Sequence, residues 1–230
     1  MSYDIRSEVR AFQMGNVTTV TPASAQRVLR NTYALLGLTL AFSALVAGVA
    51  MSLKLPHPGI LVTLVGFYGL FFLVNKTANS GKGVLAVFAL TGFMGYTLGP
   101  TLNAVMSLPG GSAAITNALG ATAAAFLGLS AIALTTKRDF SFMGKFLMIG
   151  MLTAMVLGLG AIFFEIPALS LAVSGMVVLL ASGMILFETS RIVNGGETNY
   201  VMATVGLFVS IYNLFSSLLM LFGLGGGSDD

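Results

Sequence analysis

The residues in this sequence with the greatest capacity for chemistry lie where a long apolar run meets charge. The run ends Ile185-Leu186-Phe187 and is followed by the carboxylate of Glu188, with Arg191 three residues further on. On a helix, residues three apart share a face, so the two side chains are placed to pair. An ionisable group inside an apolar span is costly to bury and is by default a candidate for carrying a proton or binding an ion. The alternative is that Glu188 and Arg191 only mark the end of the helix.

Polar side chains on the last apolar segment offer Glu188 a partner. Ser210 and Asn213 lie one helical turn apart, and Tyr212 is beside them. Hard cations prefer oxygen ligands, so these side chains predict a small cation site in which Glu188 would be a Ca²⁺ ligand. Taken alone, they are explained by hydrogen bonds between helices. Lys76, at the end of the second apolar segment, is either a positive anchor at the membrane surface or a counter-charge to Glu188 in a closed gate.

Most catalytic chemistry is excluded by what the chain lacks. Its single histidine, His57, lies between two prolines outside the apolar segments, and there is no cysteine. Both an HExxH zinc protease and a Ser-His dyad acting in the bilayer need a histidine inside a span. A membrane protease with paired aspartates needs two buried aspartates, but Asp139 is the only aspartate away from the chain ends. A seven-helix retinal protein needs a lysine in its last helix for the Schiff base, and the last apolar segment has none. The sequence therefore predicts a protein that is not an enzyme, with no catalytic residues and no bound cofactor.

The composition determines the surroundings of these residues. Of the 230 residues, 56% are hydrophobic and only 8% are charged, whereas a soluble domain has roughly a quarter of its residues charged. The surface must therefore face lipid. The net charge of +3 comes from scattered residues, which argues against a nucleic-acid partner. Crossing the hydrocarbon takes about 20 apolar residues, and we predict seven helical spans at about 32–53, 57–75, 83–106, 113–135, 141–163, 167–187 and 201–223.

Basic residues in the short connections predict the orientation of the spans, because loops that stay in the cytoplasm are enriched in Lys and Arg. One side of the bundle has Lys54, and the other has Arg6, Arg10, Arg27, Arg30, Lys76, Lys82, Lys137, Arg138, Lys145 and Arg191. We therefore predict an all-α integral membrane protein, a seven-helix bundle with a cytoplasmic N-terminus and a periplasmic C-terminus. Residues 1–28 are predicted to form a flexible cytoplasmic tail, 29–224 the membrane domain and 225–230 a short C-terminal tail.

The third span contains a stretch in which helices are expected to approach closely. Gly95 and Gly99 have the GxxxG spacing, and Pro100 follows directly. Small residues allow two membrane helices to pack backbone against backbone, which predicts a packed helix with a proline kink. The alternative is a broken helix whose freed carbonyl groups line a polar path with Asn103. Because Gly and Pro are common in membrane helices generally, packing is favoured.

Several stretches resemble the Bax inhibitor family of membrane proteins. ALTGFMGYTLGPTLNAV in the third span, KRDFSFMG after the fourth and LFETSRI at the end of the sixth all fit the family pattern. The resemblance covers about residues 28–223. It implies a seven-helix fold with a central last helix and a calcium leak that is sensitive to pH.

The same resemblance implies a pH sensor built from particular residues. In the family, an acidic residue at the end of the sixth helix pairs with one on the seventh, near a basic residue at the end of the second. Glu188 matches the first position, while Ser210 matches the second and is not acidic. The basic position falls near Asn75 and Lys76. A pH gate in this chain would therefore rest on Glu188 with Arg191 or Lys76.

RNTYALLGLTLAFSA and TLVGFYGLFFLVNKTAN look closer still to the bacterial YccA branch of the family. That similarity implies a bacterial inner membrane protein that binds and inhibits a membrane-anchored FtsH-type AAA protease. Such a protease must first engage a disordered segment, and the predicted tail is suited to this. Two functions thus follow: a protease modulator engaged through the tail or, alternatively, a pH-sensitive cation leak at Glu188. A small-solute transporter has less support, because no inverted repeat is evident.

Overall fold

The computed structural model describes residues 22–136 and 138–225, which form seven long α-helices, one short 3-10 helix and no strand. All seven α-helices are long and apolar enough to cross a membrane, so the predicted number and order of the spans are confirmed. The elements are α2 (Pro22–Ser52), α3 (Ile60–Thr77), α4 (Lys82–Met106), α5 (Gly111–Thr136), η1 (Ser141–Met143), α6 (Gly144–Phe163), α7 (Pro167–Val193) and α8 (Tyr200–Gly225).

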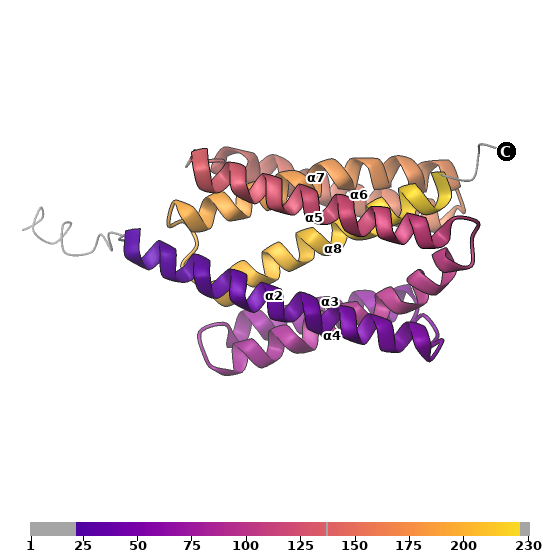
Figure 1. The fold of residues 1–230 in the computed structure, drawn as a ribbon, viewed down its shortest axis with the longest axis horizontal. Coiled ribbons are helices and arrows are strands. Elements are labelled where there is room, and N and C mark those ends of the chain that lie inside the picture. Colours follow the sequence, from indigo (N-terminus) through magenta and orange to yellow (C-terminus); the bar gives the residue numbers. More distant parts are fainter. Residues whose placement is uncertain (1–21, 137, 226–230) are drawn as a thin grey trace, which may run out of the picture.

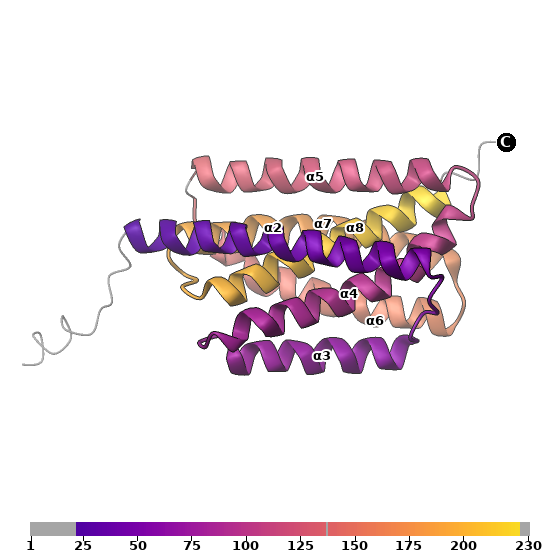
Figure 2. The same cartoon turned by 60° about the horizontal axis from the view of Figure 1, so that its bottom comes forward.

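Helix α8 occupies the centre of the bundle. Figure 1 shows α8, in yellow, running diagonally between a layer of α5, α6 and α7 and a layer of α2, α3 and α4. In the turned view of Figure 2 it again passes through the middle of the molecule. It contacts α2, α3, α4, α5 and α7. Its side chains Leu207, Phe208, Leu214 and Leu219 are almost wholly buried in the main core, so α8 is the element around which the others pack.

The first helix begins earlier than the sequence analysis placed it. α2 starts at Pro22, so residues 22–28, which were assigned to the tail, are helical. Proline is well suited to the first turn of a helix, where its missing N–H is not needed and its φ angle is already helical. Residues 1–21, with Arg6 and Arg10, lie outside the described residues, as do Lys137 and residues 226–230.

The sixth spanning helix ends later than predicted. α7 continues past residue 187 to Val193, and the turn that stops it begins at Gly195, which has a φ of +75°. The N–H of Gly195 donates to the carbonyl of Ile192 at 3.2 Å, and that of Gly196 donates to the carbonyl of Arg191 at 2.8 Å. This pair of bonds is the Schellman motif, which satisfies the last carbonyl groups of a helix. The apolar run ends at residue 187, where charged residues begin, whereas the helix continues to Val193, where these backbone hydrogen bonds terminate it.

The glycines of α4 lie in the contact with α2. A Cβ atom built on Gly95 would meet the backbone carbonyl oxygen of Ser43, and one built on Gly99 would lie 2.5 Å from the Cβ of Ala50. Both glycines are buried. The two backbones are therefore close enough that no side chain fits between them, as the GxxxG spacing predicts.

Helix α4 also passes through Pro100 without interruption and ends at Met106. The side-chain amide of Asn103 donates to the backbone carbonyl of Met51 at 2.9 Å, near the end of α2. Asn103 therefore joins two helices and does not line a polar path along a broken one.

Candidate functional site

The start of α8 is held in place by Asn199. Its Oδ1 accepts hydrogen bonds from the backbone N–H groups of Val201 (2.9 Å) and Met202 (3.2 Å), the arrangement of a helix N-cap. Its amide donates to Oδ1 of Asn79 (2.8 Å) and to the carbonyl of Ala78 (3.2 Å). One side chain thus begins α8 and ties it to the connection between α3 and α4.

Glu188 lies within α7, with its carboxylate against α8. The Oγ of Ser210 donates to its Oε2 at 3.3 Å. A Cβ atom built on Gly206 would lie only 2.6 Å from its Oε1, so the absence of a side chain at Gly206 provides the space that the carboxylate occupies. Sequence reasoning paired Glu188 with Ser210 but did not identify Gly206. The carboxylate of Glu188 therefore faces α8, the central helix, rather than the C-terminal end of α7.

Arg191 pairs with Glu197, whereas the sequence placed it to pair with Glu188. The Nη2 of Arg191 lies 3.2 Å from Oε2 of Glu197, and the guanidinium carbon lies 5.5 Å from the centre of the Phe187 ring. The Schellman turn after α7 reverses the chain and brings Glu197 back beside Arg191. Because the arginine side chain is 37% exposed, the ion pair is worth at most about 1 kcal/mol.

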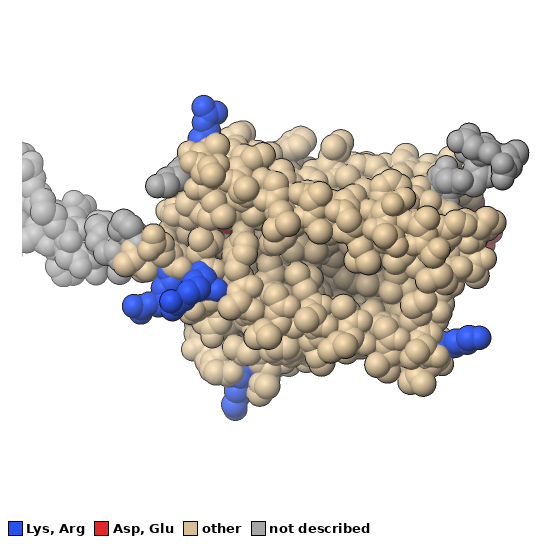
Figure 3. Space-filling view, in the orientation of Figure 1, with Lys and Arg blue, Asp and Glu red and all other residues tan. Residues whose placement is uncertain are grey.

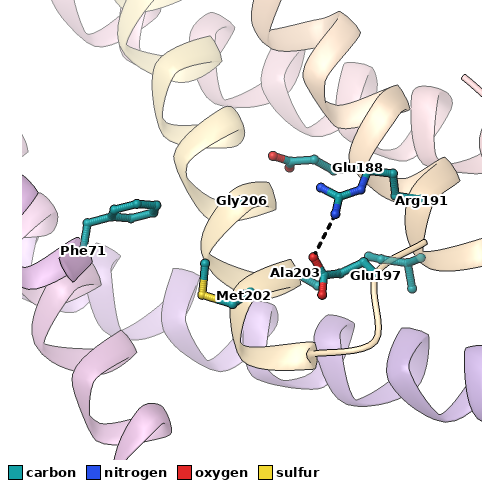
Figure 4. Close-up of a pocket in the computed structure, with 8 residues that line it drawn as sticks. Phe71, Glu188, Arg191, Glu197, Met202, Ala203 and Gly206 are labelled. Carbon is teal, nitrogen blue, oxygen red and sulfur yellow. Dashed lines mark hydrogen bonds and ion pairs between the residues drawn. The ribbon is translucent and has the colours of Figure 1, made fainter. Parts of the chain in front are cut away.

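A cavity of about 160 Å³ separates Glu188 from the turn between α7 and α8. Figure 4 shows Glu188 and Arg191 projecting from α7 toward it, with Gly206 on the neighbouring turn of α8 and Phe71 across the cavity on α3. One end of this cavity is thus lined by charged side chains and the other by apolar ones. The lining residues are Phe71, Glu188, Arg191, Ile192, Glu197, Met202, Ala203 and Gly206.

A second, larger cavity of about 950 Å³ is also lined by Glu188 and shares Phe71, Arg191 and Gly206 with the first. Glu188, Ser210 and Asn213 all line it, so the structure brings together the sequence-predicted residues of α7 and α8. Tyr212 lines it as well, with its hydroxyl 3.0 Å from Oγ1 of Thr97. Lys76 is exposed in the last turn of α3 and lines neither cavity.

The oxygen atoms around Glu188 are few for a held metal ion. Ca²⁺ takes about six to eight oxygen ligands, while the contacts at this carboxylate add one hydroxyl, that of Ser210. Over residues 22–136 and 138–225, no group of three or more His, Cys, Asp or Glu side chains is placed to hold a metal ion. The arrangement suits a brief contact with a passing cation better than a permanent Ca²⁺ site.

Comparison with known proteins places these features in a family. The family model described as "Inhibitor of apoptosis-promoting Bax1" matches residues 25–227. An uncharacterized protein of Pseudomonas aeruginosa is 55% identical over 88% of this chain and 91% of its own length. The Escherichia coli K12 protein named "Modulator of FtsH protease YccA" is 53% identical over 87% of this chain and 91% of its own.

The location of the protein follows from the same comparison. A relative from Escherichia coli O6:H1 named "Inner membrane protein YccA" is 53% identical over 87% of this chain. Together with the seven helices that are able to span a membrane, this makes the chain a multi-pass protein of the inner membrane. The match at residues 25–227 covers all seven of these helices almost completely, and so the chain belongs to the Bax inhibitor family of membrane proteins.

Proposed function

We propose that this protein binds and inhibits a membrane-anchored AAA protease of the FtsH type, which engages it through its N-terminal tail. The observation that carries the proposal is the 53% identity, over 87% of the chain, to a protein named as a modulator of FtsH protease. That name describes a regulator of another protein's activity. A regulator of this kind acts by occupying its partner and needs no catalytic residue of its own.

The distribution of basic residues supports placing the tail in the cytoplasm, where the protease would meet it. Figure 3 shows blue side chains gathered toward the end of the bundle where α2 begins, and one further group at the opposite end. Excess Lys and Arg mark the cytoplasmic side of a membrane protein. The described residues at the first end are Arg27, Arg30, Lys76, Lys82, Arg138, Lys145 and Arg191, and Lys54 lies at the other.

The bundle suits a protein that holds a pulling protease without being released from it quickly. An AAA protease threads its substrate from a free segment, so its progress depends on how fast the folded part unfolds under force. Here the folded part is packed around α8, whose buried side chains contact five other helices. Pulling on the segment before α2 must first separate α2 from α4 and α8. While the bundle resists, the protease is unavailable to other substrates.

Degradation of a second substrate tests the inhibition directly. With the protease reconstituted in liposomes and supplied with a membrane-bound reporter substrate, adding a molar excess of this protein is expected to slow reporter loss and to leave the two proteins co-purifying. An equal amount of an unrelated seven-helix protein without a tail serves as control. A reporter that is lost at the same rate with and without the protein would refute the proposal.

A second activity, a cation leak at Glu188, is supported by geometry and not by the names of the relatives. Glu188 lines both cavities, and its carboxylate lies against the central helix, where Ser210 adds a hydroxyl oxygen. A single carboxylate with few other ligands would let a cation enter and also leave, as conduction requires. The two activities use different parts of the chain, so each is testable without the other.

Calcium flux into proteoliposomes tests the leak. We expect wild-type flux to respond to pH, Glu188→Gln to lose most of it, and Gly206→Ala to reduce it, because the added methyl group would displace the carboxylate from Ser210. Glu165→Gln is the matched control, since this exposed glutamate lies in the connection between α6 and α7. Flux no greater than that of protein-free liposomes at acidic and basic pH would rule the leak out.

A further inference from the structure

The larger cavity is a groove between helices on the outside of the bundle. Side chains of α3 and α4 form one wall, those of α6 and α7 form the other, and α8 supplies its floor. Tyr68 of α3 bridges the two walls by donating its hydroxyl to the sulfur of Met155 on α6, at 3.3 Å. Met148, which lines the groove, is 60% exposed, so the groove opens at the surface. α3 and α6 are also the least buried of the seven spanning helices, which puts this opening at the lipid-facing side.

The walls of the groove match a flexible hydrocarbon chain. Many of the lining side chains are aromatic or methionine, and methionine adapts its shape readily to what it contacts. The volume of about 950 Å³ falls in the upper part of the range of roughly 300–1,000 Å³ that holds small ligands. Apolar cavities are not stably filled by water. The side chains that carry this argument are Phe67, Phe71, Phe93, Met148, Met151 and Met184.

Two basic side chains, those of Lys145 and Arg191, line the groove. Lys145, in the first turn of α6, lines the groove and is exposed. Arg191 lines it too, but its guanidinium is engaged by Glu197, and this is the one ion pair in the described part of the chain. Asp139 lies outside the groove lining and accepts a hydrogen bond from the backbone of Ser141, and its bonds with Ser141 lower the pKa of its carboxyl. Lys145 is therefore left to attract an anion at the level of the lipid headgroups.

We propose that this groove binds one acyl chain of an anionic phospholipid, whose phosphate is held by Lys145. An apolar slot with a basic residue at its headgroup end has the pattern by which membrane proteins recognise acidic lipids. The acyl chain would lie over the α8 floor and cover Glu188 and Asn213, which line the deeper part of the groove. A zwitterionic lipid carries the same phosphate beside a cationic group, so its headgroup has no net charge and Lys145 attracts it less strongly.

Native mass spectrometry of the full chain, titrated with phosphatidylglycerol or phosphatidylcholine, tests the proposal. Lys145→Gln is expected to weaken phosphatidylglycerol binding about fivefold, the contribution of one basic residue near a headgroup, and to weaken phosphatidylcholine binding less. Met148→Trp, which adds bulk at the opening of the groove, is expected to weaken both lipids. Lys76→Gln is the matched control, because this exposed lysine lies outside the groove.

Two results would overturn the proposal. If phosphatidylglycerol binds wild type and Lys145→Gln equally well, no basic site for its phosphate exists at the groove. If only Lys145→Gln weakens binding and Met148→Trp does not, the lipid binds at the surface and its chain lies outside the groove. The change in thermal unfolding temperature that each lipid causes in each variant gives a second measurement. It does not require the protein–lipid complex to survive in the mass spectrometer.

Discussion

Replacing Gly95 with valine is expected to force α2 and α4 apart and to lower the free energy of unfolding by about 3 kcal/mol, the upper part of the range for overpacked cores. A Cβ atom at this position would meet the backbone carbonyl oxygen of Ser43. A clashing side chain can rotate away, but a carbonyl inside a helix cannot, so the helices themselves must move. Thermal unfolding of the purified protein in detergent measures the loss.

The matched control lies on the partner helix. Gly48→Val adds the same side chain to α2, at a position where a Cβ atom has no neighbour within 4 Å. This variant is expected to keep the wild-type stability to within about 0.5 kcal/mol, as changes away from packed contacts usually do. Equal losses in Gly95→Val and Gly48→Val would show that any valine disturbs these helices, and that the close α2–α4 contact is not what stabilises them.

The spans and this contact were predictable because each depends on a short-range property of the sequence. About 20 apolar residues are enough to cross the hydrocarbon, so counting them locates a helix without knowing its neighbours. Gly95 and Gly99 are likewise informative by themselves, because two glycines at this spacing leave a flat strip on any helix. Their burial in a close contact between helices therefore follows from the sequence, although the identity of α2 as the partner, with Ser43 and Ala50 as neighbours, does not.

The end of α7 was mispredicted because apolarity and helicity end at different residues. The apolar count stops before Glu188, whereas the helix continues until Gly195 adopts a positive φ. The Asn-Gly-Gly stretch at 194–196 is the sequence signal that predicts this stop. Extending α7 to that point places Glu188 inside the helix, and the turn after it explains why Arg191 finds Glu197.

Gly206 was missed because nothing in α8 shows which of its faces meets α7. Helices that are apolar all round carry no stripe to orient them. The spacing did hold a clue, since Gly206 lies four residues before Ser210 and thus on the same face. A glycine one turn before Ser210 leaves room for the carboxylate that accepts the hydrogen bond from Ser210. Identifying Gly206 requires knowing that this face of α8 packs against α7, and the sequence alone does not show that.

Removing residues 2–21 is expected to abolish degradation of this protein by the FtsH-type protease, reducing its loss to that of a reaction without ATP. A protease of this kind needs a free segment to grip. In the deletion variant only Met1 precedes α2, which begins at Pro22. The bundle itself should be unaffected, with the thermal stability of the full chain. Degradation with the purified protease, followed over time on gels, measures the effect.

Two further variants separate the tail from the rest of the molecule. A chain in which residues 2–21 are replaced by an unrelated polar sequence of equal length should be degraded again if the protease needs only a free segment. Full-length Glu188→Gln should be degraded like wild type, because the carboxylate contacts Ser210 of α8 and the variant keeps residues 2–21 intact. If the truncated chain were degraded as fast as wild type, the tail would not be the point of engagement. Inhibition of the protease would then have to come from contacts of the helices within the membrane.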